Sequence, residues 1–139
     1  MNDPTPILQE IDQLYMLIAD CEKVIFKNKE EIGKLEQSTE KAAKRKVRMN
    51  DNLSSYLAKV SAASQRLSPA SEIKNDYVQG IKSIVRGTSA NRVMGSLDKA
   101  MRDMKKAIEK LEYENEELLR RKMEYLQDIS RLRQQLKDM

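Results

Sequence analysis

Carboxylates are the reactive side chains that this sequence supplies in quantity, and four of them gather at Glu112, Glu114, Glu116 and Glu117. Two carboxylates can serve as general acid and general base when a concave pocket moves their pKa values apart. Here the glutamates stand among leucines and lysines at helical spacing, which is typical of a solvated helix face. We therefore expect no catalytic residues, and we interpret the protein as a non-enzyme.

The remaining reactive side chains also indicate a protein without catalytic residues. The chain has one cysteine, Cys21, and no histidine. The absence of histidine removes the commonest general base, the Ser–His pair and any Cys/His zinc site. Cys21 falls at an apolar position of a helical repeat, where a thiol acts as a small hydrophobic side chain. No Gly-rich phosphate loop is present, so we expect neither a metal nor another cofactor.

The composition indicates long helices. The chain has 139 residues, of which 40% are hydrophobic and 35% charged, with one Phe and no Trp. Such a profile fits helices that bury a narrow seam and expose the rest. The net charge of +4 is spread over interleaved acidic and basic residues. The one basic cluster, residues 41–48, lacks the aromatic residues of single-strand binders, so nucleic acid is not the favoured partner.

We expect no standard signal peptide at the start of this sequence. The first residues, MNDPTPILQEID, contain neither the basic nor the apolar region of a signal peptide. No apolar run approaches the length of a membrane span. We expect a cytoplasmic protein without a membrane span, and export by a route that needs no signal peptide stays open.

The element that must position most side chains is a long helix over about residues 6–67. Apolar residues recur there in alternating steps of four and three, and among eighteen positions only Asn28 and Lys46 are strongly polar. This repeat of 3.5 residues predicts a supercoiling helix with one apolar seam. The seam positions are Ile7, Ile11, Leu14, Ile18, Cys21, Ile25, Asn28, Ile32, Leu35, Thr39, Ala42, Lys46, Met49, Leu53, Tyr56, Val60, Ala63 and Leu67.

A second, shorter helix is predicted over about residues 69–86. Ser68 is a good N-cap and Pro69 suits the first helical position. Gly87 is expected to end this helix, because glycine adopts the left-handed conformation of a C-cap at little cost.

A third helix is predicted over about residues 89–139, with Thr88 or Ser89 as its N-cap. The same alternating steps continue through it without a proline. Its seam positions are Ala90, Met94, Leu97, Met101, Met104, Ile108, Leu111, Asn115, Leu118, Lys122, Tyr125, Ile129, Leu132, Leu136 and Met139.

The two seams match in an antiparallel register. Pairing residues whose numbers sum to 143 sets Ile25 against Leu118 and brings the two seam asparagines, Asn28 and Asn115, together. One buried amide can satisfy another, so such a pair selects a register. The prediction is an all-α fold with a single domain, 1–139, that forms a long antiparallel helical hairpin with a short intervening helix and a glycine turn near residue 87. The alternative is an oligomer in which the same seams pair between chains.

The turn resembles a known motif. Helix, Trp-x-Gly, then a small residue and Ala opening a second helix is the plan of the WXG-type proteins of type VII secretion. Val85-Arg86-Gly87 occupies the Trp-x-Gly place, and Thr-Ser-Ala-Asn follows it. The long N-terminal helix is similar to that of the small α-helical proteins encoded beside LXG toxins. Val85 stands where the family has tryptophan, so a role of that ring does not carry over.

The resemblance also implies an export motif and partners. The family's export signal is Tyr-x-x-x-Asp/Glu in its second helix, and Tyr113 with Glu117 matches it. The LXG-associated proteins bind the helical N-terminal domain of the toxin and help target it to the secretion machine. The implied partners are therefore such a toxin domain and a second small helical protein.

We accordingly expect an adaptor or targeting chaperone that binds partner helices. Two groups of residues are the candidate partner surface: apolar residues flanking the first seam, and methionines near the turn, which repack easily. They are Tyr15, Leu17, Val24 and Phe26, and Met94, Met101 and Met104. The alternatives are a self-associating structural coiled coil and a helical regulator that contacts nucleic-acid machinery through residues 41–48.

Overall fold

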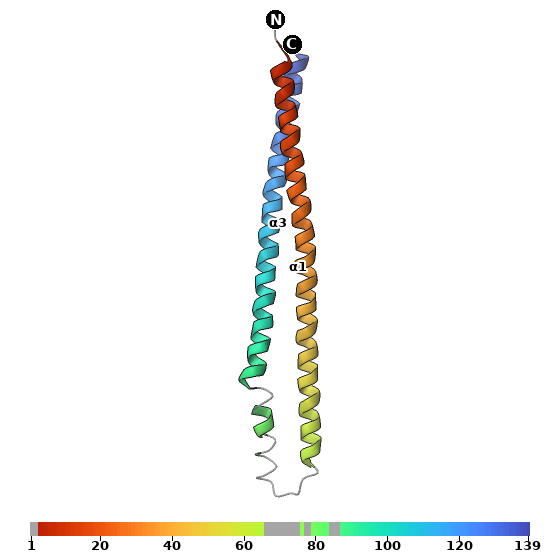
Figure 1. The fold of residues 1–139 in the computed structure, drawn as a ribbon, viewed down its shortest axis with the longest axis vertical. Helices are drawn as coiled ribbons and strands as arrows, with labels where there is room; N and C mark the ends of the chain where they lie inside the picture. The colour runs from red at the N-terminus through yellow and green to blue at the C-terminus, as the bar shows by residue number, and fades with distance from the viewer. Residues whose placement is uncertain (1–2, 66–75, 77–78, 84–86) are drawn as a thin grey trace. The chain divides into compact units, whose positions relative to one another are not determined.

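The computed structural model describes residues 3–65, 76, 79–83 and 87–139, and two long helices account for most of them (Figure 1). Helix α1 is Thr5–Gln65 and helix α3 is Thr88–Lys137. The described residues contain no strand. The all-α prediction is therefore confirmed. The predicted short helix over 69–86 lies largely outside the described residues, although 76 and 79–83 are helical.

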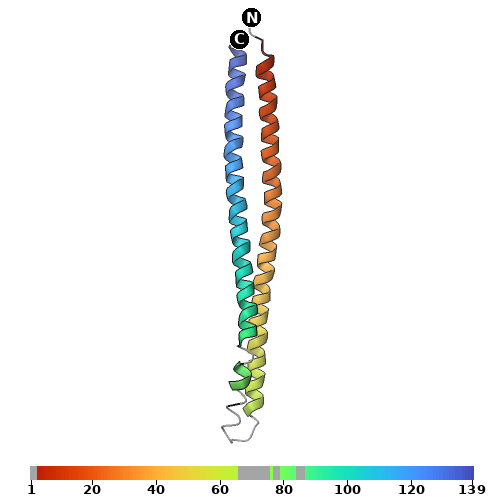
Figure 2. The same ribbon diagram turned by 60° about the vertical axis from the view of Figure 1, so that its left-hand side comes forward.

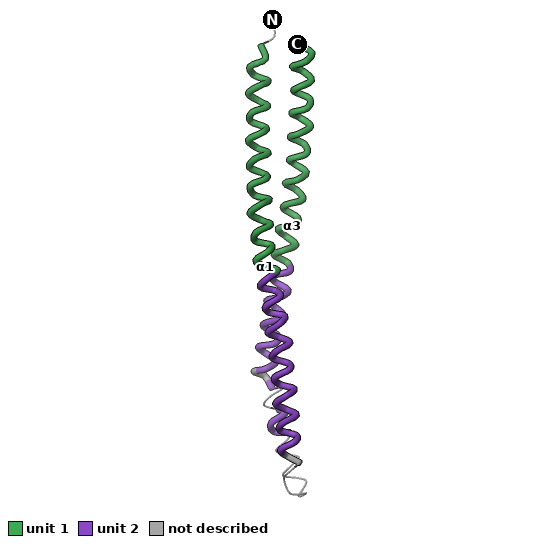
Figure 3. Tube along the Cα trace, turned by 90° about the vertical axis from the view of Figure 1, so that its right-hand side faces the viewer, with its two compact units in different colours: residues 1–36, 106–139 green, residues 37–105 purple. Residues whose placement is uncertain are grey.

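The chain divides into two compact units (Figure 3). Unit 1 consists of residues 1–36 and 106–139, and unit 2 of residues 37–105. Each unit therefore contains a part of α1 and a part of α3. Among the described residues no helix is long and apolar enough to cross a membrane.

Pro4, Pro6 and Asp3 stabilise the N-terminus of α1. The Leu8 amide donates to the Pro4 carbonyl at 3.0 Å, and the Thr5 amide donates to Oδ1 of Asp3 at 2.9 Å. Pro6 in the first turn loses nothing, because the first amides of a helix have no partner within it. The hydrogen bonds from the Thr5 backbone and side chain hold the pKa of Asp3 below its usual value.

Helix α3 begins one residue earlier than predicted. The Asn91 amide donates to the Gly87 carbonyl at 3.2 Å, and Thr88 is the first helical residue. Gly87 therefore holds the N-cap position, and the prediction of Thr88 or Ser89 as N-cap is wrong. Glycine is acceptable there because the N-cap residue is not yet helical. The predicted C-cap role of Gly87 involves residues 84–86, which lie outside the described residues.

In unit 1 the two helix segments lie side by side and run antiparallel (Figures 1 and 2). Their core is a cluster of four buried residues, Ile11, Ile18, Ile129 and Leu132. Four partly buried residues pack against this cluster, namely Ile7, Leu14, Tyr125 and Leu136. All eight are predicted seam residues. Fully burying one such side chain contributes roughly 1.5–3 kcal/mol, so this cluster stabilises the pairing of the two helix segments in unit 1.

The asparagine pair is present and confirms the predicted register. Nδ2 of Asn28 donates to Oδ1 of Asn115 at 2.9 Å, and Asn115 is 8% exposed. Within the described part of the chain, no buried side-chain nitrogen or oxygen lacks a hydrogen-bond partner. The two amides thus satisfy each other between apolar seam residues such as Ile25 and Leu118.

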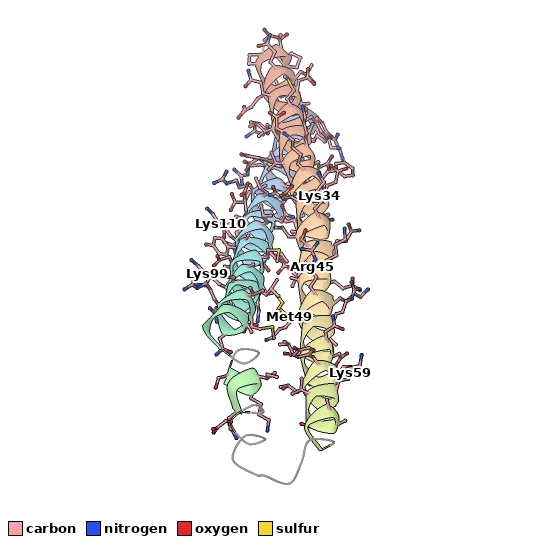
Figure 4. The ribbon with its side chains drawn as sticks, turned by 60° about the horizontal axis from the view of Figure 1, so that its bottom comes forward. Lys34, Arg45, Met49, Lys59, Lys99 and Lys110 are labelled. Atoms are coloured by element: carbon pink, nitrogen blue, oxygen red, sulfur yellow. The ribbon has the colours of Figure 1, made fainter. Side chains whose placement is uncertain are left out.

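Unit 2 has the same register but a different seam chemistry. The Thr39 hydroxyl donates to the Met104 sulfur at 3.7 Å, and these two numbers again sum to 143. Nζ of Lys46 lies 2.5 Å from Oδ1 of Asp98, so the seam lysine reaches a carboxylate on α3. Met49 projects between the helices, whereas Lys59 points outward (Figure 4).

The predicted seam fails at its edges. Tyr56 is 51% exposed, and Ala63 and Met139 are also exposed. In the observed register Tyr56 lies opposite Gly87, the residue before α3, so no turn of α3 covers it. Met139 lies beyond the last residue of α3. Val60, four residues further along α1, is 9% exposed and buried as predicted, so Tyr56 marks a local gap in the seam and not its end.

Candidate protein-binding surfaces

The reactive side chains are dispersed. Cys21 is 7% exposed and lies in the seam of unit 1, where it packs as an apolar residue. Glu112, Glu114 and Glu116 are exposed on α3. No group of three His, Cys, Asp or Glu residues in the described part of the chain is placed to hold a metal ion. The candidate sites in the described residues are therefore surfaces that could contact another protein.

Of the candidate turn motif, the structure describes only the last residue, Gly87. Val85 and Arg86 lie outside the described residues, and Gly87 caps α3 as given above. The candidate export motif is fully described. Tyr113 is 65% exposed, and Glu117, one turn further along α3, forms an ion pair with Arg120 at 2.8 Å. The tyrosine ring is therefore open to contact, while the carboxylate is held by a neighbouring guanidinium.

The three candidate methionines lie in unit 2, half-buried in the seam. Met104 accepts the hydrogen bond from Thr39, and Met94 lines an open groove of about 390 Å³ between α1 and α3. The other residues of the groove wall are Lys46, Asn50, Leu53, Ser54, Leu57, Ala90, Asn91 and Asp98. The Lys46–Asp98 ion pair belongs to this wall and gives it a polar character.

The basic cluster is partly neutralised. Nζ of Lys44 lies 3.1 Å from a carboxylate oxygen of Glu40, one turn earlier on α1. Lys46 is paired with Asp98 across the seam. Two of the five basic residues between 41 and 48 thus have carboxylate partners within unit 2.

The apolar flank residues of unit 1 are exposed, as expected for a contact surface. Phe26 is 64% exposed, Leu17 43%, Tyr15 42% and Val24 36%. They do not form one surface. Tyr15 and Leu17 are two residues apart and point roughly 160° apart around the helix axis. Leu17 and Val24 are two helical turns apart and share one direction, which we call the Leu17 side.

Tyr15 and Phe26 lie on the opposite flank, which we call the Tyr15 side. They are eleven residues apart, about three helical turns, so their side chains point in nearly the same direction. Arg133 of α3 donates a hydrogen bond to the Tyr15 hydroxyl, and its guanidinium lies 5.8 Å from the centre of the tyrosine ring. This flank of α1 therefore faces the corresponding flank of α3.

Sequence reasoning missed the α3 half of the Tyr15 side. Leu119, Met123 and Leu126 are 48%, 59% and 42% exposed and follow each other at steps of four and three residues. Arg133 lies one heptad after Leu126 and therefore points in nearly the same direction. Because Arg133 contacts Tyr15, these three apolar residues lie along the flank of α3 that adjoins the Tyr15 side of α1. The spacing was a usable signal, because each of these residues comes next to a seam position.

Comparisons of the chain with protein-family models, with curated proteins and with solved structures found no match.

Proposed function

We propose that this protein is a non-enzymatic helical adaptor that binds amphipathic helices of a partner protein on unit 1. One observation carries the proposal: apolar side chains are exposed along both flanks of unit 1, beyond those that fill its seam. Isolated exposed apolar residues are ordinary on protein surfaces, but aligned ones mark contact surfaces.

The Leu17 side fits a partner helix. Leu17 and Val24 are seven residues apart and therefore present two apolar contacts along one line of α1. A helix that lies along this line and places apolar residues at i and i+7 would meet both. In the antiparallel register, Arg121 and Asp128 of α3 flank the same side, so charged residues of both signs border the contact.

The identity of the partner rests on the resemblance around Val85-Arg86-Gly87. On that basis the partner is the helical N-terminal domain of an LXG-type toxin, and the adaptor targets it to a type VII secretion system. Export of the adaptor with its partner would need no signal peptide. The exposed ring of Tyr113 is compatible with a signal that another protein reads.

Co-expression tests the proposal. The chain would be produced with the tagged helical N-terminal domain of an LXG-type toxin from the same genome, and the amount that co-purifies would be measured. We expect Leu17→Glu combined with Val24→Glu to abolish co-purification, because two carboxylates would be desolvated in the contact. Met16→Glu is the matched control, since Met16 is 69% exposed on α1 between the two flanks, away from the seam.

The helical content of each variant would be compared by circular dichroism. Retained binding by a folded Leu17→Glu/Val24→Glu protein would refute the Leu17 side as the partner site. Failure of the unmodified chain to bind the toxin domain would refute the toxin as the partner.

A further inference from the structure

We infer that two copies of unit 1 associate through their Tyr15 sides, with α3 against α3 and α1 against α1, each pair antiparallel about one twofold axis. The occupant of this face is thus a second copy of the same chain. The Leu17 side stays free for another partner, so this inference goes beyond the proposed function and does not depend on it.

Two stripes make up the face. On α3 the stripe has an apolar centre formed by Leu119, Met123 and Leu126. On α1 the stripe contains Leu8, Tyr15, Ala19 and Phe26, all of them exposed. The stripes adjoin each other, because two contacts join the helices on this side: the Arg133–Tyr15 hydrogen bond and the Lys122–Glu22 ion pair at 2.9 Å.

The charges at the ends of the α3 stripe are arranged for self-pairing. Glu112 and Glu116 precede its apolar centre, and Arg133 and Lys137 follow it, all at the same helical spacing. When a second α3 is laid antiparallel so that Met123 meets Leu126 of the second copy, Glu116 meets Arg133 of that copy and Glu112 meets Lys137. The acidic end of each α3 stripe thus faces the basic end of the other copy's stripe. Each contact therefore occurs twice, as it must in an interface with twofold symmetry.

The α1 stripe matches itself under the same operation. Tyr15 then meets Phe26 of the second copy, and Asp12 meets Lys29. An offset or edge-to-face pair of aromatic rings is favourable beyond the area that it buries. The carboxylate of Glu22, already paired with Lys122, would lie opposite the small side chain of Ala19 of the second copy.

One axis can serve both stripes. The midpoint of the α1 stripe lies between Asp20 and Cys21, and the midpoint of the α3 stripe lies between Glu124 and Tyr125. In the register of the Asn28–Asn115 pair, these two midpoints lie within about 3 Å of the same level of unit 1, which is two residues along a helix. The resulting dimer is an antiparallel four-helix bundle, in which exposed apolar stripes of two hairpins become the core.

The competing arrangement sets α1 of one copy against α3 of the other. It would place Glu22 against Met123 of the second copy, which desolvates a carboxylate beside an apolar side chain. It would also pair Glu116 with Lys29 of the second copy and Arg133 with Asp12. The two arrangements therefore pair the same charges differently, and charge reversal distinguishes them.

Sedimentation equilibrium of the full chain tests the inference. We expect a reversible dimer whose dissociation constant rises on the order of tenfold or more in Met123→Glu, because this residue lies next to the axis. The Met16→Glu variant should dimerise like the unmodified protein. A chain that is monomeric at all accessible concentrations would overturn the inference, as would a folded Met123→Glu protein that dimerises normally.

Charge reversal then tests the arrangement. Glu116→Arg and Arg133→Glu should each weaken the dimer, and the two changes in one chain should restore it, because each new charge meets its opposite across the axis. In the competing arrangement the double variant would be weaker than either single variant. Binding of the toxin domain is read out separately through the Leu17 side, so failure of one proposal leaves the other standing.

Discussion

Asn28 and Asn115 are the two side chains that fix the register most specifically. Apolar seam residues such as Ile18 and Ile129 pack in more than one register, because leucine and isoleucine side chains accept many neighbours. An amide buried without a partner loses its hydrogen bonds with water and gains none. The Asn28–Asn115 hydrogen bond of 2.9 Å is available in one register, so shifted alignments of the hairpin are penalised.

Replacing one asparagine should therefore cost more than replacing both. We expect Asn28→Leu to lower the free energy of unfolding by about 1–3 kcal/mol, because it leaves the amide of Asn115 buried and unpaired. Asn28→Leu with Asn115→Leu should match or exceed the stability of the unmodified protein, since two apolar side chains replace the amide pair and no buried amide is left without a partner. Urea denaturation measures both. A single variant more stable than the double variant would show that the pair does not act in this way.

Asp3 should make the start of α1 sensitive to pH. Its pKa is lowered by the hydrogen bonds from Thr5, so the contact favours the ionised carboxylate. The stabilisation is complete above the pKa of the unfolded chain and is lost as the pH falls through the lower pKa of the folded state. We expect the NMR signal of the Thr5 amide to titrate below the usual range for aspartate. In Asp3→Asn, which keeps an acceptor, the titration should disappear; a signal that still titrates there would exclude Asp3 as the cause.

At the scale of the elements, the sequence predicts the parts in which two helices face each other. Steps of four and three residues identify the seam positions from Ile7 to Leu53 and, beyond the exposed Tyr56, the buried Val60, and the seam asparagines identify the antiparallel register. The repeat cannot tell where a helix loses its partner, which is why Tyr56 was wrongly placed in the seam. The start of α3 also differed, because Gly87, Thr88 and Ser89 are all acceptable at an N-cap.

For the candidate surfaces, too, the sequence predicts one part and leaves another undetermined. The flank residues Tyr15, Leu17, Val24 and Phe26 are all exposed, as the sequence predicts, and their role as a partner surface stays a prediction. Their separation into two sides follows from their helical angles, yet it becomes evident only when Arg133 shows which flank of α1 adjoins α3. Whether either side binds a partner depends on a second molecule, and one chain does not contain that information.

Gly95 is a weak point in the interior of α3. It is exposed, and a Cβ atom built there meets no other atom within 4 Å. We expect Gly95→Ala to raise the free energy of unfolding by roughly 0.5–1 kcal/mol, because alanine loses less backbone entropy on folding into a helix. Ala100→Gly, at an exposed position of the same helix, should lower it by a similar amount. Thermal unfolding that shows no gain for Gly95→Ala would indicate that this turn of α3 is not helical in solution.

At the scale of the whole molecule, binding is assigned to the outside of unit 1 and stability to its seam. Leu17 and Val24 stay exposed beside Ile18 and Ile25, which are buried against α3 of the same chain, so the flank can bind a partner helix without opening the seam. The same holds for self-association through the Tyr15 side. If the seams paired between chains, a dimer would need no apolar flank at all.

Every surface assigned to this protein thus depends on one chain filling its own seam, and disulfide trapping tests this directly. In a Cys21→Ala background, we expect Ile25→Cys with Leu118→Cys to form a disulfide within one chain, since the register sets these residues opposite each other. Ile25→Cys with Tyr125→Cys, displaced by one heptad or about 10 Å, should not form it. On a non-reducing gel the linked product should migrate as a single chain. Disulfide-linked pairs of chains in place of that product would contradict the intramolecular hairpin.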